Sequence, residues 1–300
     1  MSLPNFLIVG ASKSGTTSLY EYLGEHPDVF MSPLKETNFF TFDGRRPRFG
    51  GPDGAVFVRD SIYQRDDYER LFADRKSETA VGEASPRYLF TPGTAERIQR
   101  LIPRARIVAI LRNPAERAFS AYCMRVRDGW ESCRSLEEAM ADEPRRLRES
   151  WASGIYLQRG YYGAQLSEYF DRFPTEQIRV YLYDDLRADP QGLLRDLFRF
   201  LGVDDGFSPD MSRRYNVSGV IRNPLLRFLW TRTHPLQAAL RPFVSKVLRQ
   251  RISRFFVATE KERFEMSAEL RRRLTENYRA DILQLQDLIQ RDLSVWLRPG

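Results

Sequence analysis

The residues best suited to chemistry lie near the N-terminus, where a glycine-bearing turn follows a short apolar run. Residues 6–9 are apolar, and Gly10 and Gly15 then enclose four residues that include Lys13. A strand, a turn and a helix start in this order bind phosphate, because the first N–H groups of the helix are free and its dipole favours negative charge. Gly15 can adopt backbone angles that other residues rarely adopt. The sequence therefore predicts an anion-binding loop made of Ser12, Lys13, Ser14, Gly15, Thr16, Thr17 and Ser18.

The two glycines have the spacing of a nucleoside-triphosphate P-loop, but the lysine is displaced. A P-loop carries Lys and then Ser or Thr directly after its second glycine. Here Thr16 and Thr17 occupy those positions, and Lys13 lies inside the loop. A kinase or NTPase also needs an acidic residue after a strand to hold magnesium. Asp184 and Asp185 follow a predicted strand and keep that alternative open.

A second pattern suited to phosphate lies further along the chain. Residues 107–111 are apolar and rich in β-branched side chains, which predicts a buried parallel strand. Arg112 follows with a planar fork that matches phosphate. Asn113 suits a helix N-cap, and Glu116 stands where a capping box has its acidic residue. Ser120 lies two helical turns after Asn113 and shares its face. Arg112 and Ser120 are thus a second candidate phosphate site. The structural alternative is that Arg112 only caps the strand and that Ser120 only fills a helix groove.

The elements that position these residues alternate along the chain. We expect strands at residues 5–9, 79–82, 106–111 and 178–183 and a short extended piece at 29–31. We expect helices at 15–25, 94–102, 114–127, 135–149, 160–172 and 190–201, and a loop rich in Gly, Pro and Arg at 43–54. This alternation predicts an α/β fold of three layers, P-loop-like, with a central parallel sheet flanked by helices. Lys13 and Arg112 then lie beyond the carboxyl ends of strands, where such sheets bind ligands.

The last third of the sequence is predicted to be mostly helical and packed on the sheet within one domain spanning residues 1–300. Residues 224–256 carry apolar groups at helical spacing among Arg and Lys. A long amphipathic helix is predicted at 267–290, with Ser267 as its cap. Its apolar stripe consists of Leu270, Leu274, Tyr278, Ile282, Leu285 and Ile289.

Composition narrows the class of protein. The chain has 300 residues and a net charge of +7, which suits a polyanionic ligand, and it carries no nucleic-acid recognition motif. It has no apolar run long enough for a membrane span and no signal peptide, although peripheral membrane contact stays open. Cys123 and Cys133 match no zinc or redox pattern. We therefore expect a cytoplasmic protein with reduced thiols and no metal, of an oligomeric state that the sequence leaves undetermined.

The two phosphate patterns together resemble those of the sulfotransferases that use 3′-phosphoadenosine 5′-phosphosulfate (PAPS), in their soluble bacterial-type branch. Residues 13–19 look like the 5′-phosphosulfate loop, and residues 107–120 resemble the 3′-phosphate segment. The resemblance implies PAPS as donor, Lys13 as a catalytic cation, and a hydroxyl, or less favourably an amine, of a carbohydrate or small molecule as acceptor. Residues 214–224 are similar to the segment that closes over the 3′-phosphate. Gly219 and Arg222 are its candidate contacts, unless this stretch is only a loop.

A carboxylate is the expected base, because His26 and His234 are the only histidines and His26 stands before a proline at a helix end. Residues 35–40 resemble the segment of heparan-type sulfotransferases that carries a glutamate base, and Glu36 matches it. Glu83 begins a second similar segment, in which Ala84 replaces a lysine and puts a heparan-like acceptor in doubt.

Several alternatives stay open at this point. Lys35 is a candidate substitute for the lysine missing at position 84. Glu36 and Glu83 are both candidate bases. The structural alternatives are a solvated loop carboxylate for Glu36 and a buried acid paired with an arginine for Glu83. For the whole chain, a non-catalytic basic module that binds anions is the second alternative.

Overall fold

The computed structural model describes residues 3–42, 44–211 and 265–298. The expected helical region at 224–256, the candidate contacts Gly219 and Arg222, and His234 lie outside the described residues.

Five parallel strands form one sheet in the order β2-β3-β1-β4-β5. They are β1 (Phe6–Gly10), β2 (Val29–Met31), β3 (Ala80–Ala84), β4 (Arg106–Leu111) and β5 (Ile178–Leu182). The predicted parallel sheet is confirmed, and β3 runs two residues beyond its expected end. Because β1 lies between β3 and β4, the segments that follow these three strands meet at one edge of the sheet.

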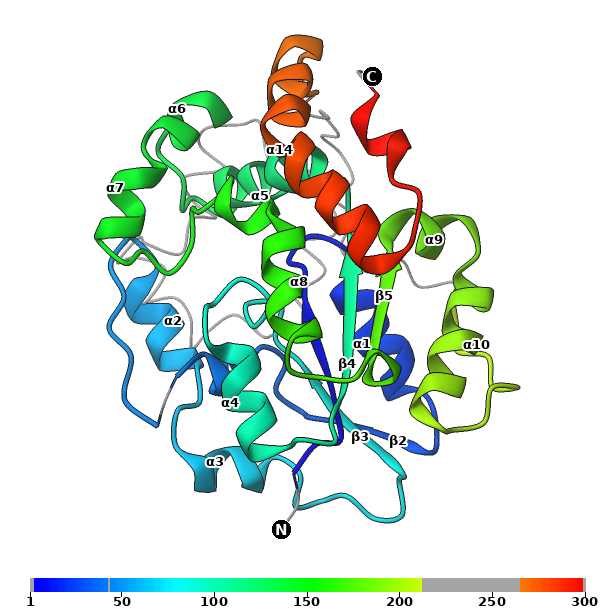
Figure 1. Cartoon of the computed structure of the whole chain (residues 1–300). Coiled ribbons are helices and arrows are strands. Elements are labelled where there is room, and N and C mark those ends of the chain that lie inside the picture. Colours follow the sequence, from blue (N-terminus) through cyan, green and yellow to red (C-terminus); the bar gives the residue numbers. More distant parts are fainter. Residues whose placement is uncertain (1–2, 43, 212–264, 299–300) are drawn as a thin grey trace.

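Helices cover both faces of the sheet and complete the predicted three layers (Figure 1). One face packs against α4 (Thr94–Leu101), α5 (Pro114–Arg127), α8 (Tyr162–Phe170) and α14 (Ala268–Ile289). The other face packs against α1 (Thr16–Gly24), α9 (Tyr183–Ala188) and α10 (Pro190–Leu201). Side chains alternate along β1, so Leu7 joins the first core and Phe6 the second. Each side chain buried in this way contributes about 1.5–3 kcal/mol.

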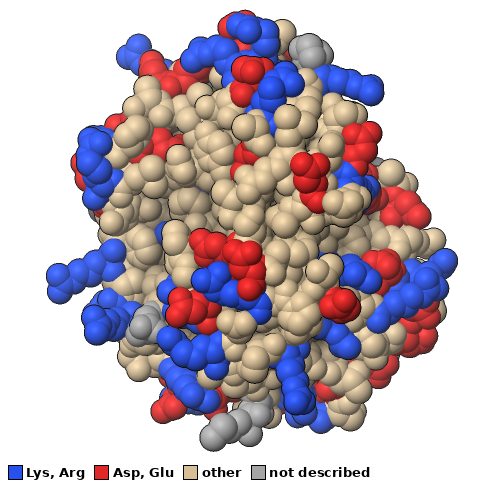
Figure 2. All heavy atoms as spheres, viewed as in Figure 1, with Lys and Arg blue, Asp and Glu red and all other residues tan. Residues whose placement is uncertain are grey.

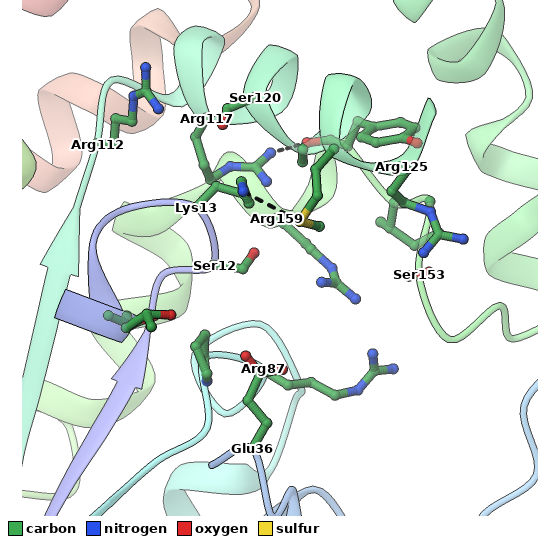
Figure 3. A pocket seen from close by; sticks show the side chains of 18 of the residues that line it. Ser12, Lys13, Glu36, Arg87, Arg112, Arg117, Ser120, Arg125, Ser153 and Arg159 are labelled. Carbon is green, nitrogen blue, oxygen red and sulfur yellow. Dashed lines mark hydrogen bonds between the residues drawn. The ribbon is translucent and has the colours of Figure 1, made fainter. Parts of the chain in front are cut away.

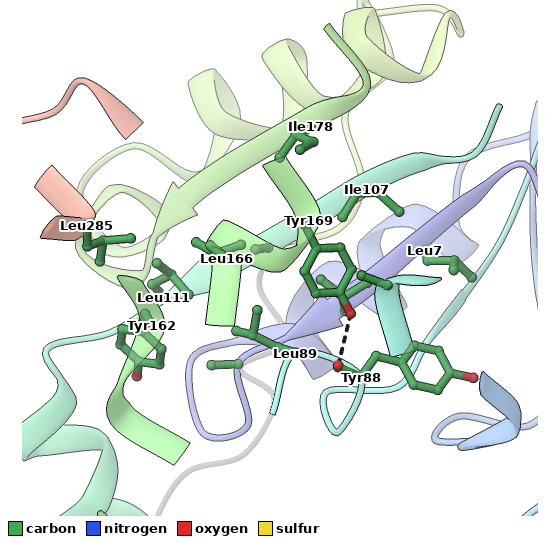
Figure 4. Close-up of a cluster of buried hydrophobic side chains, with 14 of the residues drawn as sticks. Leu7, Tyr88, Leu89, Ile107, Leu111, Tyr162, Leu166, Tyr169, Ile178 and Leu285 are labelled. Atoms are coloured by element: carbon green, nitrogen blue, oxygen red, sulfur yellow. Dashed lines mark hydrogen bonds between the residues drawn. The ribbon is translucent and has the colours of Figure 1, made fainter. Parts of the chain in front are cut away.

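The first core is rich in tyrosine as well as aliphatic residues (Figure 4). Tyr169 on α8 is fully buried, and its hydroxyl donates to the backbone oxygen of Tyr88 at 2.9 Å. This bond joins α8 to the segment that leaves β3. A buried tyrosine needs such a partner, because an unpaired hydroxyl in a core is destabilising.

The predicted C-terminal helix is confirmed as α14. The Ser267 hydroxyl accepts from the N–H of Leu270 at 3.2 Å, as expected for an N-cap. Five of the six residues of the predicted stripe are buried, and Ile289 is partly exposed. The Asp281 carboxylate accepts from the N–H groups of Gly163 and Ala164, each at 3.0 Å, and so caps α8. The chain end is thereby attached to the sheet core.

Other elements differ from the expectations. The helix expected at 135–149 is divided into α6 (Leu136–Ala141) and α7 (Glu143–Arg148), because Pro144 has no N–H to continue a hydrogen-bond ladder. The expected loop at 43–54 ends where α2 (Gly54–Asp60) begins, and α3 (Arg65–Arg70) follows. These short helices and α9 were not predicted, since six or seven residues carry little periodic signal.

The exposed face drawn in Figure 2 carries Lys and Arg side chains interspersed with Asp and Glu. The net positive charge is therefore not spread as one continuous patch over this face, and the cavity described next holds a concentrated share of it.

Within the described ranges, no helix is both long enough and apolar enough to cross a membrane.

Candidate functional site

A cavity of about 430 Å³ lies beyond the carboxyl ends of β1, β3 and β4 (Figure 3). It brings together most of the predicted site residues from three distant segments. Those that line it are Ser12, Lys13, Gly15, Thr16, Thr17, Ser18, Glu36, Arg112 and Ser120. Ser14 and Glu83 are fully buried and do not line it. The edge of the sheet predicted to bind ligands is thus the edge that carries the cavity.

The turn between β1 and α1 has the geometry expected of an anion loop. Gly15 caps α1 with φ +101°, and a Cβ there would lie 2.9 Å from Cδ2 of Leu186. Glycine is favoured at this position because the backbone angle strains any residue with a side chain, and a Cβ would also require Leu186 to shift. Lys13 also has a positive φ, +69°. Strained backbone of this kind is found at binding sites, where it fixes the direction of a side chain.

The Lys13 ammonium lies inside the cavity and 3.3 Å from the sulfur of Met124. Burial, followed by the positive charge of Arg127, lowers the pKa of Lys13 to about 8. Both causes disfavour the charged ammonium in the free protein. A bound anion would reverse them, so Lys13 is suited to bind phosphate or sulfuryl oxygens.

The second predicted motif places Arg112 and Ser120 on the wall formed by β4 and α5. Asn113 is confirmed as the N-cap, since its side-chain oxygen accepts from the N–H groups of Ala115 and Glu116 at 3.0 and 3.3 Å. The prediction that Glu116 forms a capping box is wrong. The Glu116 carboxylate is instead paired with Arg112 at 3.1 Å and with Arg271 at 3.3 Å. Two guanidinium groups outcompete one backbone N–H for a carboxylate, because both bonds are charge-assisted.

Arg112 is also stacked on an aromatic ring. Its guanidinium carbon lies 5.0 Å from the ring centre of Tyr183, the first residue of α9. The ring holds one face of the guanidinium by a cation–π contact, and the edge formed by Nε and Nη2 donates to Glu116 at 3.3 and 3.1 Å. The strand end, Glu116 and Tyr183 thus fix Arg112 at the cavity wall.

Glu36 enters the cavity from the opposite side, on a backbone with φ +63°. Its N–H donates to the backbone oxygen of Ala84 at 2.9 Å, which attaches the segment to the end of β3. The side chain is 55% exposed and pairs with the ammonium of Lys35 at 2.7 Å. Lys35, the candidate substitute for the lysine missing at position 84, contacts Glu36 but does not line the cavity. Ala84 itself is buried.

Glu83 lies behind Glu36 as a fully buried carboxylate. It accepts four hydroxyl hydrogen bonds of 2.6–2.9 Å, from Thr37, Tyr68, Ser85 and Tyr88. Burial raises the pKa of Glu83, and the four hydroxyls counteract that rise in part. Its neighbours are hydroxyls, not the arginine that the structural alternative expected. Its candidacy as the base stays a prediction.

His26 has structural partners at the end of α1. One ring nitrogen lies 2.9 Å from the backbone oxygen of Asp204, and the other accepts from the N–H of Asp28 at 3.0 Å. The ring is buried between Phe198 and Phe207. His26 does not line the cavity, which agrees with its interpretation as a helix-ending residue.

Sequence reasoning missed five arginines that line the cavity: Arg87, Arg117, Arg125, Arg127 and Arg159. With Lys13 and Arg112 they make seven cationic side chains, against the two carboxylates of Glu36 and Asp53. Arg117 could have been found, because it stands one helical turn before Ser120. The others come from segments without a local pattern, and only the tertiary structure assembles them.

Comparison with known proteins identifies the family. The sequence profile of the sulfotransferase family matches residues 52–208, more than half of the chain. The chain belongs to the sulfotransferase family. This membership confirms the resemblance seen in the two phosphate motifs.

Curated relatives of this sulfotransferase include two human enzymes. The human bifunctional heparan sulfate N-deacetylase/N-sulfotransferase 3 is 27% identical over 207 residues, covering 67% of this chain and 22% of that protein. The human N-deacetylase/N-sulfotransferase 2 is 29% identical over 211 residues, with the same coverage. The chain thus spans about a fifth of the length of the curated relatives it matches.

A solved structure of similar length supports the same fold. The crystal structure of a sulfotransferase from Alicyclobacillus acidocaldarius is 37% identical and superposes with a TM-score of 0.79. The match covers 99% of this chain and 100% of that one. The predicted P-loop-like α/β fold is therefore the sulfotransferase fold.

Proposed function

We propose that this chain is a PAPS-dependent sulfotransferase that transfers a sulfuryl group to a hydroxyl of a carbohydrate or small-molecule acceptor. Transfer to an amine is the less favoured alternative. The observation that supports it most is the convergence of Lys13, Glu36 and Arg112 on one cation-rich cavity. Membership of the family supplies the reaction class. The cavity supplies the positive charge that a polyanionic donor requires.

The residues present fit a donor with phosphate groups at two positions. The free N–H groups at the start of α1, Lys13 and the hydroxyls of Thr16 and Thr17 would hold the 5′-phosphosulfate. Arg112 and Ser120 would hold the 3′-phosphate, for which the guanidinium of Arg112 is already fixed by Glu116 and Tyr183. PAPS, when bound, supplies the sulfuryl group and a phosphate leaving group. The chain's part is to orient these groups and to neutralise charge on the leaving oxygen.

Glu36 is the proposed general base. It lines the same cavity as Lys13, and its carboxylate is exposed enough to reach an acceptor hydroxyl. Its backbone is anchored to the end of β3, so the carboxylate is placed by the fold. The proton of the acceptor hydroxyl would pass to the Glu36 carboxylate while the oxygen bonds to sulfur and the bond between sulfur and the leaving phosphate oxygen breaks. Glu83 would then act by positioning, since its oxygens face four hydroxyls and not the cavity.

Calorimetry with 3′-phosphoadenosine 5′-phosphate (PAP), in buffer with EDTA and again with magnesium, tests the donor. We expect tight binding of one PAP that is unaffected by magnesium. Transfer of labelled sulfate from PAPS to a panel of hydroxylated acceptors tests the reaction. Absence of PAP binding, or binding that requires magnesium, would refute the proposal.

The rival kinase or NTPase needs an acidic metal ligand near the phosphates. Asp185, which follows β5, instead accepts from the N–H of Leu182 at 3.0 Å and pairs with Arg291 at 2.5 and 2.6 Å. Neither Asp184 nor Asp185 lines the cavity. A non-catalytic anion-binding module is the other rival. Such a module would still bind anions after loss of Lys13 and would transfer no labelled sulfate.

A further inference from the structure

The cavity is lined by three arginines that the proposed donor site does not use. We call Arg87, Arg117 and Arg159 the arginine cluster. Arg87 follows β3, Arg117 lies on α5, and Arg159 lies in the 3₁₀ turn Gln158–Gly160. Figure 3 shows Arg112 and Arg87 on opposite sides of Lys13, whereas Arg117 lies beside Lys13, so Arg87 and Arg159 are the cluster members that lie away from the proposed 3′-phosphate site.

The guanidinium groups of the cluster donate to backbone oxygens and not to acidic side chains. Arg87 and Arg159 both donate to the backbone oxygen of Ala152, at 2.5 and 3.1 Å, and this shared acceptor holds the two guanidinium groups together. Arg117 is fully buried and donates to the backbone oxygen of Tyr156. In the part of the chain that the structure describes, none of the three arginines forms an ion pair.

Aromatic rings fix the direction of the two outer guanidinium groups. Arg87 lies over the rings of Phe49 and Phe57, at 4.7 and 4.6 Å from their centres. Arg159 lies over the ring of Phe90 at 5.1 Å. Because the rings take one face of each guanidinium, the N–H edges remain for another ligand.

Several N–H donors of the cluster have no acceptor. Nε of Arg87, Arg117 and Arg159 and Nη1 of Arg117 are buried without a hydrogen-bond partner among the described residues. A buried unpaired donor is destabilising, and one on a charged group more so. Like charges gathered in this way also repel each other, and burial together with that repulsion lowers the pKa of Arg87 to about 9. A bound anion would offset this repulsion.

Among the described residues, Asp53 and Glu36 are the carboxylates that line the cavity beside the cluster, and Asp53 has other partners. It pairs with Arg125 at 2.9 Å and accepts from the hydroxyl of Ser153. The exposed carboxylate of Glu36 lies beside Arg87 and is paired with Lys35. The cluster therefore keeps a net positive charge directly beside the proposed base.

We infer that the arginine cluster binds a compact anionic group on the acceptor and so directs the acceptor's hydroxyl toward Glu36. This inference rests on the proposed function. The acceptor is a molecule that carries a carboxylate, phosphate or sulfate near the hydroxyl that is modified. The enclosed cluster, with its forks converging from three segments, suits a single anionic group more than a neutral sugar or sterol surface.

The test measures a second anion in protein already saturated with PAP. Inorganic phosphate, sulfate and acetate are titrated separately by calorimetry into the wild-type protein and into the double variant Arg87→Gln/Arg159→Gln. We expect one further anion to bind the wild-type protein, and the double variant to bind it at least about tenfold more weakly, as loss of charge-assisted bonds implies. The ranking of the three anions identifies the group on the acceptor.

The matched control is Arg106→Gln. Arg106 also donates to a backbone oxygen, that of Leu201 at 2.6 Å, and lies over a phenyl ring, that of Phe200, but it stands at the opposite end of β4. We expect this variant to bind the second anion as the wild type does. PAP affinity reports the fold of each variant and should stay within about twofold.

Three results of the titrations would overturn the inference: no second anion in the PAP-bound protein, equal binding by the double variant, or a parallel loss of PAP affinity in that variant. The last result would place the cluster in the donor site. If PAP fails to bind but phosphate binding still depends on Arg87 and Arg159, the proposed donor is wrong and the anion site stands. Among compounds that accept labelled sulfate in a screen, a set composed only of uncharged molecules would also refute it.

Discussion

The hydroxyl of Thr37 donates a 2.7 Å hydrogen bond to the buried carboxylate of Glu83, and Thr37 directly follows Glu36. The N–H of Asn38 is held in turn by the hydroxyl of Ser85 at 3.1 Å. Glu83 therefore fixes the segment that carries Glu36 without facing the cavity itself. The two carboxylates that compete for the role of base are parts of one arrangement, in which Glu36 lines the cavity and the buried Glu83 supports its segment.

Glu36→Gln should leave PAP affinity unchanged and lower the rate of sulfate transfer by about a hundredfold or more, the usual share of general-base catalysis. Glu83→Gln, assayed with the same acceptor, is the matched comparison. A large loss of rate at Glu83 with little change at Glu36 would reverse the assignment of the base. Large losses at both would indicate that one carboxylate takes the proton and the other orients the acceptor.

Glu83→Ala should lower the free energy of unfolding by about 3 kcal/mol or more, because four buried hydroxyls lose their common acceptor. Glu83→Gln should cost less, since it keeps a carbonyl oxygen and removes a buried charge. Urea denaturation followed by circular dichroism measures both. Equal stability of the alanine variant and the wild type would show that the hydroxyls are satisfied in another way.

PAP affinity should depend on pH through Lys13. The pKa of Lys13 is lowered to about 8 in the free protein, so above that pH binding must include uptake of a proton. Affinity should fall as pH rises from 8, toward a limit of about tenfold per pH unit. Lys13→Arg keeps its charge over this range and should show a flat profile. The same slope in both proteins would remove Lys13 from the phosphate site.

The lowered pKa of Lys13 also predicts that the stability of the free protein rises with pH, whereas its PAP affinity falls. Because the folded-state pKa of Lys13 lies below its ordinary value of 10.5, the unfolded chain binds more protons between pH 8 and 10.5. The contribution of this group to the free energy of unfolding therefore rises with pH through that window. Lys13→Met should lack that increment in urea denaturation at pH 8 and pH 10.

Arg112→Ala and Ser120→Ala should weaken the nucleotide chiefly through its 3′-phosphate. The measurement is the ratio of affinities for nucleotides with and without that phosphate. Each substitution should shrink the ratio by about tenfold or more, the size of one or two charge-assisted hydrogen bonds. If the ratio is unchanged, the 3′-phosphate is bound elsewhere.

Gly15→Ala should lower stability and PAP affinity together, because φ is +101° and the new Cβ would lie 2.9 Å from Leu186. The positive φ alone costs about 1–2 kcal/mol for a residue with a side chain. Gly24→Ala is the control at the other end of α1, where a Cβ meets only Met31 at 3.9 Å. A Gly15 variant as stable as the Gly24 variant would contradict the tight-turn assignment.

The sequence by itself determined the parallel sheet, the two phosphate motifs and the stripe of α14. Each of these is a local pattern. The run of residues 6–9 followed by Gly15, and the run of residues 107–111 followed by Arg112, carry their strand, turn and helix start within a few positions. Local periodicity and capping chemistry decide such elements before any distant contact forms.

Only the tertiary structure decided which charges share the cavity. Arg87, Arg125 and Arg159 stand on separate segments whose sequences differ in no visible way from those of surface arginines. Their convergence depends on the order of β3, β1 and β4 and on how the segment around Ala152 crosses the cavity. The exposure of Glu36 to the cavity and the burial of Glu83 were decided in the same way, because burial and hydrogen-bond partners are properties of the packed chain.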